Sequence, residues 1–173
     1  MVKEYVLTGT ARSFRDTEII VSKTDKKGIL SYVNRTFIHI SDYREAELLG
    51  KPHNIIRHPD MPRAVFRLMW ERIQGGREIF AYVVNRCKNG DHYWVLAHVT
   101  PSFDAGGALC GFHSNRRRPD EDIVARQIVP LYAEMRRLER EAADPRLGMD
   151  QSLAHLNATL AAKGLDYDRF FFA

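Results

Sequence analysis

Residues 50–70 read GKPHNIIRHPDMPRAVFRLMW, and the rest of the chain is organised around this stretch. Its two prolines, Pro59 and Pro62, fix their own φ angles and bias the residues before them toward extended backbone. Pro62 suits the first turn of a helix, and Asp60 just before it can cap free N–H groups. The stretch therefore predicts a stiff polar loop that leads into an amphipathic helix over residues 62–74.

Three polar side chains cluster on this loop: Arg57, His58 and Asp60. A cation, an imidazole and a carboxylate next to an aromatic residue such as Trp70 can hold a polar, planar ligand. A structural interpretation stays open beside this one, in which Arg57 pairs with Asp60 on the surface and Trp70 is core. The cluster as a whole favours a ligand site.

The composition is that of a soluble globular protein: the 173 residues are 45% hydrophobic and 28% charged. A net charge of +4 is too small to indicate nucleic-acid binding, and residues 116–118, Arg-Arg-Arg, precede three acidic residues, which favours a solvated strand end. Residues 1–10 lack the apolar core of a signal peptide, and no apolar run reaches transmembrane length. With two cysteines and no disulfide framework, we expect a cytoplasmic protein without membrane insertion.

Strands and helices are expected in blocks along the chain. Asn34 opens a helical stretch, and Asp42 with Glu45 suggests a capping box for a short helix that follows. Asn89-Gly90 is a strong hairpin signal. The order of two strands, several helices and a three-stranded meander predicts an α+β domain with an antiparallel sheet. We expect the strands at residues 18–22, 29–33, 79–87, 92–103 and 108–117.

Beyond Pro119 the chain becomes helical. Pro130 interrupts an apolar seam, so we expect a kink or two abutting helices there. A linker at residues 143–148 and a last helix at 151–163 come next. The seam consists of Val124, Ile128, Leu131, Met135, Leu138 and Ala142, and the aromatic residues of the tail that should cover an apolar surface are Tyr167, Phe170, Phe171 and Phe172.

Enzymatic and metal chemistry have little support in the sequence. No histidine or cysteine pair has a tight zinc spacing, no glycine-rich phosphate loop follows a strand, and no nucleophile is signalled near His58. Asn85 differs, because it shares a strand face with small and apolar residues. An amide there is either paired with backbone or contacts a ligand. We expect no metal site and no enzyme.

Several of these motifs resemble the PAS domain of bacterial aerotaxis receptors. The similar blocks are GKPHNIIRHPDMP from residue 50, Met69-Trp70, and NRCKNGDHYWV from residue 85. The resemblance implies a PAS fold, with a five-stranded antiparallel sheet and helices on one face. It divides the chain into an N-terminal cap at residues 1–16, expected to be loose, a PAS sensor domain at 17–118, and a C-terminal helical extension at 119–173.

In that family the domain binds FAD non-covalently and reports redox or oxygen state to chemotaxis signalling. The resemblance therefore implies FAD as cofactor and a chemoreceptor or other signalling protein as partner, with a homodimer as a further option. An isoalloxazine ring needs an apolar wall, an amide at its edge and polar groups near its tail, and the chain offers one of each. The flavin contacts implied are Asn34, His53, Arg57, His58, Asp60, Trp70 and Asn85.

Two departures from the family pattern limit this carry-over. Where aerotaxis receptors tend to carry tryptophan early in the first meander strand, this chain has Ile79-Phe80, and no membrane anchor follows, so we expect a stand-alone relative. The cysteine motif of blue-light PAS domains is also missing, so no covalent photoadduct is expected. Two alternatives remain open: a PAS domain that binds b-type haem through a histidine, and a cofactor-free interaction module.

Overall fold

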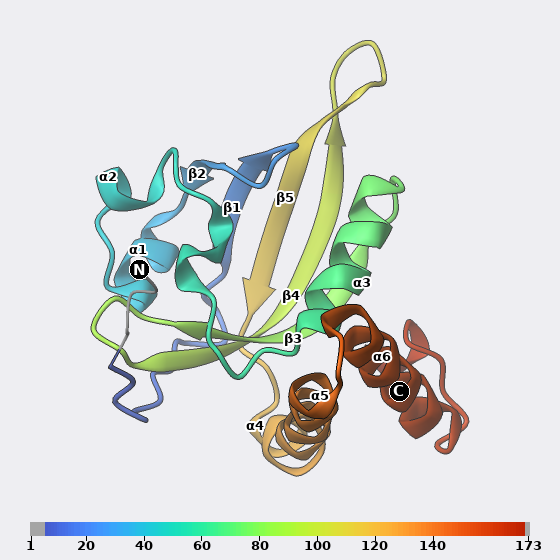
Figure 1. The fold of residues 1–173 in the computed structure, drawn as a ribbon. Helices are drawn as coiled ribbons and strands as arrows, with labels where there is room; N and C mark the ends of the chain where they lie inside the picture. Colours follow the sequence, from blue (N-terminus) through green and yellow to red (C-terminus); the bar gives the residue numbers. More distant parts are fainter. Residues whose placement is uncertain (1–5, 172–173) are drawn as a thin grey trace.

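A computed structural model of the protein describes residues 6–171, and its centre is one antiparallel sheet (Figure 1). The strand order is β2-β1-β5-β4-β3, which confirms the expected five-stranded sheet. The three meander strands begin and end within a residue of the expected bounds, because Asn-Gly and Gly-Gly turns mark their limits. The strands are β1 (Ile20–Asp25), β2 (Leu30–Val33), β3 (Ile79–Arg86), β4 (His92–Phe103) and β5 (Leu109–Arg117).

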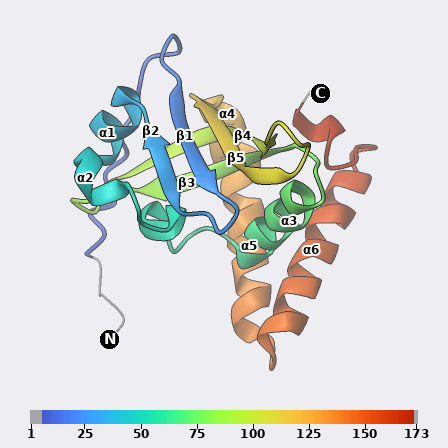
Figure 2. The same cartoon turned by 90° about the horizontal axis from the view of Figure 1, so that it is seen from above.

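Helices from the middle of the chain cover one face of the sheet, which we call the inner face (Figures 1 and 2). Strand registers decide which side chains share that face, because alternate residues of a strand point the same way. Asn85 pairs with Tyr93, and Ala97 pairs with Arg116 on its other side. The helices are α1 (Arg35–Ser41), α2 (Glu45–Leu48), the 3-10 turn η1 (His53–Ile56) and α3 (Arg63–Gln74).

One of the expected helix starts is wrong. Asp42 does not begin the short helix α2 but ends α1, in a left-handed conformation with φ of 62°. The box lies two residues later, where the Arg44 N–H donates to the Glu47 carboxylate at 2.9 Å. Aspartate is found at both ends of helices, because it caps N-termini with its side chain and also adopts the left-handed backbone conformation that ends a helix. Its identity alone therefore does not tell the two positions apart.

The C-terminal extension folds as a helical hairpin, and Pro130 is accommodated by abutting elements as expected. Pro130 lies in the first turn of α5, where no N–H is required, and a π-helical segment, η2, precedes it. The elements are α4 (Glu121–Ile123), η2 (Val124–Ile128), α5 (Val129–Glu141), α6 (Pro145–Ala161) and η3 (Arg169–Phe171).

The expected linker at residues 143–148 is wrong, because α6 already begins at Pro145. The Asp144 carboxylate caps it by accepting from the N–H groups of Arg146 and Leu147, at 2.7 and 3.1 Å. Gly148 is not a linker glycine. A Cβ there would lie 3.0 Å from the Cα of Glu139, so this glycine lets α6 approach α5 closely.

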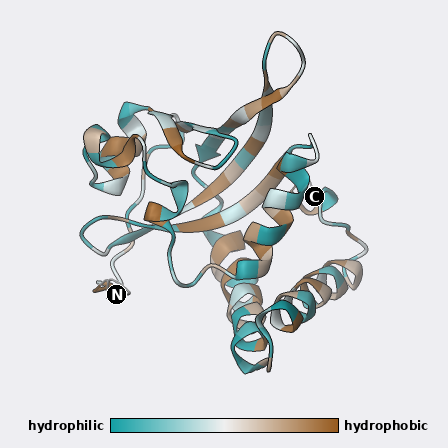
Figure 3. Ribbon diagram, turned by 45° about the horizontal axis from the view of Figure 1, so that its top comes forward, coloured by the Kyte–Doolittle hydropathy of each residue, from teal (hydrophilic) through white to brown (hydrophobic). Residues whose placement is uncertain are grey.

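The hairpin and the tail cover the outer face and the free edge of β3. The Tyr132 hydroxyl donates to the carbonyl of Tyr82 at 2.7 Å, and the Tyr167 hydroxyl donates to the carbonyl of Phe80 at 2.8 Å. An exposed edge strand invites pairing with other chains, so these contacts shield it. Figure 3 shows hydrophobic segments along the strands and mostly hydrophilic segments along the outer helices. The buried seam residues are Val124, Ile128, Leu131 and Met135; Phe172 lies outside the described residues.

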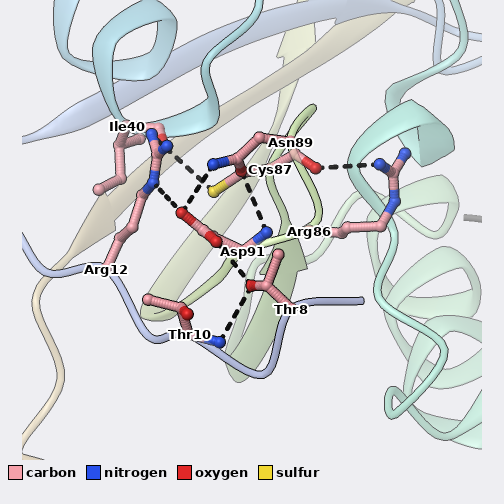
Figure 4. A network of polar contacts seen from close by, with 8 residues as sticks. All are labelled: Thr8, Thr10, Arg12, Ile40, Arg86, Cys87, Asn89 and Asp91. Carbon is pink, nitrogen blue, oxygen red and sulfur yellow. Dashed lines mark hydrogen bonds and ion pairs between the residues drawn. The ribbon is translucent and has the colours of Figure 1, made fainter. Parts of the chain in front are cut away.

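The described part of the N-terminal cap is tied down, which corrects the expectation of a loose segment (Figure 4). The Thr8 N–H donates to the carbonyl of Gly90 at 3.1 Å, and the Thr8 hydroxyl donates to Asp91 at 2.6 Å. Arg12 Nε lies 2.8 Å from the same carboxylate. The polar side chains of this segment are typical of a solvated tail, but in the structure they form hydrogen bonds and an ion pair with the β3–β4 hairpin.

Acid is expected to release this N-terminal segment. Hydrogen bonds from Thr8, Asn89 and Arg12 lower the pKa of Asp91 from 3.8 to about 2. Because the folded-state pKa is the lower one, the carboxylate stabilises the fold fully above about pH 4, and this contribution is lost as the pH falls toward 2. Backbone NMR shifts of Thr8 and Arg12 should report a transition in that window.

Two variants check the assignment of this acid transition. Asp91→Asn should abolish the transition, because the variant has no carboxylate to protonate. Asp104→Asn should retain it, since Asp104 caps the separate β4–β5 turn. A transition that persists in Asp91→Asn would contradict the account.

No helix among residues 6–171 has both the length and the apolar character needed to cross a membrane.

Candidate functional site

A cavity of about 240 Å³ lies between the inner face of the sheet and helix α3. Its walls are mostly apolar: α3 contributes one side and the strands contribute the other. Pockets of this kind, apolar with a few convergent polar groups, are typical of small-molecule sites. The apolar lining residues are Phe66, Met69, Trp70 and Ile73 from α3, and Val83, Ala97, Val99 and Phe112 from the sheet, while Ile56 comes from η1.

Trp70 forms an aromatic corner of this cavity. Its ring meets the edge of Phe112 with centroids 5.5 Å apart, and it also lies against Gly28 in the β1–β2 turn. Gly28 has φ of +79°, and a Cβ there would come within 3.0 Å of Trp70 Cη2. Only glycine combines that backbone angle with such a close approach. The turn and α3 therefore close over the cavity at this corner.

A buried polar chain forms another part of the wall. Arg116 is 2% exposed and donates from Nη2 to the Ser22 hydroxyl. Ser22 Oγ in turn lies 3.2 Å from His53 Nε2. The Ser22 hydroxyl therefore links the Arg116 guanidinium to the His53 ring, as a hydroxyl can accept two hydrogen bonds and donate one.

The linked side chains of Arg116, Ser22 and His53 carry one positive charge and no negative charge to balance it. Burial lowers the pKa of Arg116 to about 10, so the guanidinium still carries its charge at neutral pH. Burial, and after it the charge of Arg116, lower the pKa of His53 to about 3, so His53 is neutral. Within residues 6–171, Nε and Nη1 of Arg116 are buried without a hydrogen-bond partner. The guanidinium also lies over the Phe37 ring, 4.6 Å from its centroid, which stabilises the charge but gives these two nitrogens no acceptor. A ligand that carries an acceptor or negative charge would supply one.

Asn85 adds a second unpaired donor. Its Nδ2 is buried and lacks a hydrogen-bond partner among the described residues, and the residue lines the cavity. Arg57 lies opposite Asn85 in an isolated antiparallel bridge and stacks its guanidinium over Phe66, 4.4 Å from the ring centroid. The cavity thus offers aromatic and apolar walls together with hydrogen-bond donors for a planar ligand that carries acceptors.

Four of the seven residues singled out from the sequence line the cavity: His53, Arg57, Trp70 and Asn85. Asn34 does not line it. Its side-chain oxygen accepts from the N–H groups of Phe37 and Val21, and its Nδ2 donates to Ile19, so it caps α1 and ties that helix to β1. All of its polar atoms are occupied by backbone, which leaves Asn34 out of the candidate site.

His58 and Asp60 also lie off the cavity wall. His58 is buried, and its Nδ1 accepts from the Asp60 N–H at 3.1 Å, while its ring lies 5.7 Å from that of His92. The Asp60 carboxylate pairs with Arg136 of α5 at 2.5 Å. Both residues therefore brace the loop that carries Arg57 and do not themselves line the cavity.

Sequence reasoning missed Arg116. The expectation of a solvated strand end at residues 116–118 is wrong for Arg116, which is buried, and holds for Arg117 and Arg118, which are exposed. The signal was the period of two along β5, which puts Phe112, Ser114 and Arg116 on one face. The hairpin turn at residues 25–28 was expected, but nothing in its composition shows that Lys27 and Gly28 line the cavity beside Trp70.

Within residues 6–171, no group of three or more His, Cys, Asp or Glu side chains is placed to hold a metal ion. Both cysteines are free; Cys87 is buried and Cys110 is exposed.

Comparison with known proteins points to one family. Residues 30–115 match the family model of the PAS fold. The aerotaxis receptor of Escherichia coli strain K12 is 43% identical over 118 residues, which make up 68% of this chain and 23% of the receptor. The biofilm dispersion protein BdlA of Pseudomonas aeruginosa is 24% identical over 139 residues, 80% of this chain and 34% of that protein. The chain thus spans about a quarter to a third of the length of these relatives.

Solved structures agree with the fold. The dark structure of the blue-light photoreceptor Aureochrome1 LOV matches with a TM-score of 0.55 at 21% sequence identity, covering 69% of this chain and 86% of that one. At this identity the likeness bears on the fold alone. Taken with the sheet order and the position of the cavity, the matches show that the chain belongs to the PAS domain family and is related to the E. coli aerotaxis receptor.

Proposed function

We propose that this PAS domain binds FAD non-covalently in the cavity and reports redox or oxygen state to a chemotaxis-type signalling protein. The observation that supports this most strongly is the pair of buried, unpartnered donors, Arg116 and Asn85, on an otherwise apolar cavity. The edge of an isoalloxazine ring presents carbonyl oxygens and ring nitrogens that such donors would satisfy. The relation to the aerotaxis receptor, and the FAD that this resemblance implies, point the same way.

Each part of the cavity has a role in this proposal. Trp70 and the apolar residues would flank the ring, while Arg116 and Asn85 would donate to its edge. Lys27, Asn54 and Arg57, the polar lining residues of the neighbouring turn and loop, would hold the ribityl and phosphate part of the cofactor.

A bound flavin supplies reversible electron uptake. Arg116 keeps its positive charge at neutral pH, and its Nη2 is held at the wall by a hydrogen bond to Ser22. It therefore favours negative charge on whatever ligand group lies beside it. In this way the chain's own residues would make ligand binding sensitive to the charge, and so to the reduction state, of the ligand.

The proposed setting is the cytoplasm, without catalysis by this chain. The proposed partner is a chemoreceptor or another signalling protein, with a homodimer as the alternative assembly.

An absorption spectrum of the purified protein tests the proposal. We expect flavin bands and, after acid precipitation, release of a flavin that co-migrates with FAD. A Soret band would show that the cofactor is haem and not a flavin. A colourless, folded preparation that ignores added FAD would instead support a cofactor-free interaction module.

A further inference from the structure

Helix α3 has no cap of its own. Pro62 occupies the N-cap position and makes no side-chain hydrogen bond to the helix. The first free N–H groups are bonded instead by a residue that lies far away in the sequence: the Glu139 carboxylate of α5 accepts from Arg63 at 2.9 Å and from Ala64 at 3.0 Å. The C-terminal extension thus supplies the cap of the helix that forms the cavity wall.

A second contact reaches the loop before that helix. Arg136 lies three residues before Glu139 on α5, on the same side of the helix, and it pairs with Asp60. Asp60 in turn stands three residues after Arg57, which lines the cavity. Together the two α5 residues hold both the loop and the first turn of α3.

The other side of the same turn faces the cavity. Phe66 is a lining residue, and the Arg57 guanidinium stacks on its ring. The segment held from outside by α5 is therefore the segment that presents Arg57 and Phe66 to a ligand.

The α5–α6 hairpin is tightly packed and contacts α3 at further points. Gly148 packs directly against Glu139, and α6 adds an ion pair from Asp150 to Arg67 of α3 at 2.7 Å. A third ion pair, from Asp168 of the tail, reaches Arg72. Helix α3 thus lines the cavity with one side and is contacted elsewhere by α5, α6 and the tail. Figure 1 shows the hairpin next to the first turns of α3.

We propose that Glu139 and Arg136 are positioning residues of the cavity, and that ligand binding in the cavity and docking of the α5–α6 hairpin stabilise one another. This inference rests on the proposed function for the identity of the ligand. Coupling between two sites is reciprocal: whatever factor docking adds to ligand affinity, the ligand adds to docking. The hairpin would then be held against α3 more firmly when the cavity is occupied than when it is empty.

The test compares Glu139→Gln with Glu134→Gln. The first replacement leaves one acceptor oxygen and puts an NH₂ group where the second N–H donates, so the cap is half lost. The second lies on the same helix but faces Arg137 on the surface, which makes it a matched control. FAD affinity is measured by fluorescence titration, and hydrogen exchange is followed in α3, α5 and α6 with and without FAD.

We expect Glu139→Gln to weaken FAD binding about three- to tenfold and Glu134→Gln to leave it unchanged. FAD should slow exchange in α5 and α6 of the wild type, and slow it less in Glu139→Gln. Asp60→Lys and Arg136→Glu should each weaken binding, and the double variant should restore it in part, which would show that binding depends on the ion pair between the two residues.

Unchanged FAD affinity in Glu139→Gln, with faster exchange in α5 and α6, would overturn the inference. If the wild type binds no FAD, the proposed function fails, and exchange in the ligand-free variants still decides the inference. Faster exchange through residues 66–73 of Glu139→Gln would support a positioning role toward the cavity, whereas faster exchange only at Arg63 and Ala64 would reduce Glu139 to a local cap.

Discussion

Replacing Met135 with aspartate is expected to unfold the C-terminal hairpin and to lower the stability of the whole domain by several kcal/mol. Met135 is fully buried on α5 within the continuous apolar core. An unpaired carboxylate there loses its hydration without gaining a partner, which costs on the order of 3–5 kcal/mol. That is a large fraction of the 5–15 kcal/mol typical of a domain.

Thermal and urea unfolding of ligand-free protein measure this effect. The matched control is Leu147→Asp on α6, since Leu147 is 47% exposed and its replacement should change stability little. A Met135→Asp variant with the wild-type melting temperature and hydrodynamic radius would show that the helices do not pack as described.

Replacing Arg116 with methionine is expected to weaken FAD binding by about ten- to a hundredfold without destabilising the ligand-free protein. In the ligand-free state the guanidinium is a buried charge and two of its three nitrogens lack a hydrogen-bond partner, so an apolar side chain of similar length is expected to be neutral or stabilising. With ligand bound, the variant lacks a charge-assisted hydrogen bond worth about 1.5–3 kcal/mol. The two effects have opposite signs, which separates a ligand-binding role from a folding role.

Titration with FAD and urea unfolding of the ligand-free protein give the two numbers. Arg117→Met is the control, because Arg117 is exposed and follows Arg116 on the same strand. Loss of stability in ligand-free Arg116→Met, together with unchanged FAD affinity, would make Arg116 a structural residue of the sheet.

The order and type of the elements could be read from the sequence because local signals agree with the fold. Asn89-Gly90 ends one meander strand, and Pro62 opens α3 where the extended loop ends. The start of α6 could not be predicted in this way. Asp144-Pro145 also fits a linker, and Gly148 is explained only by the approach of another helix to within contact distance. Tertiary packing, not local preference, decides that helix.

The candidate site was predictable where a residue's neighbours in sequence are also its neighbours in space. Trp70 lies on the inner side of an amphipathic helix, and Asn85 lies on an alternating strand, so both could be placed on the cavity. Asn34 and Asp60 have side chains that suit ligands and caps equally, and the choice depends on which backbone or side-chain groups come near. For Asp60 that group is Arg136, 76 residues later in the sequence, which no local pattern reveals.

The central claim is that the space between α3 and the sheet is the flavin site, and filling that space tests it most directly. Ala97 is buried on β4, lines the cavity and pairs with Arg116 of β5. FAD titration of Ala97→Phe is the measurement, beside Ala105→Phe on the exposed β4–β5 turn as a control of equal size. We expect the Ala97 variant to fold, because the ring enters existing space, and to lose FAD binding by more than about a hundredfold, while the Ala105 variant binds like the wild type. Wild-type FAD affinity in a folded Ala97→Phe protein would contradict the account.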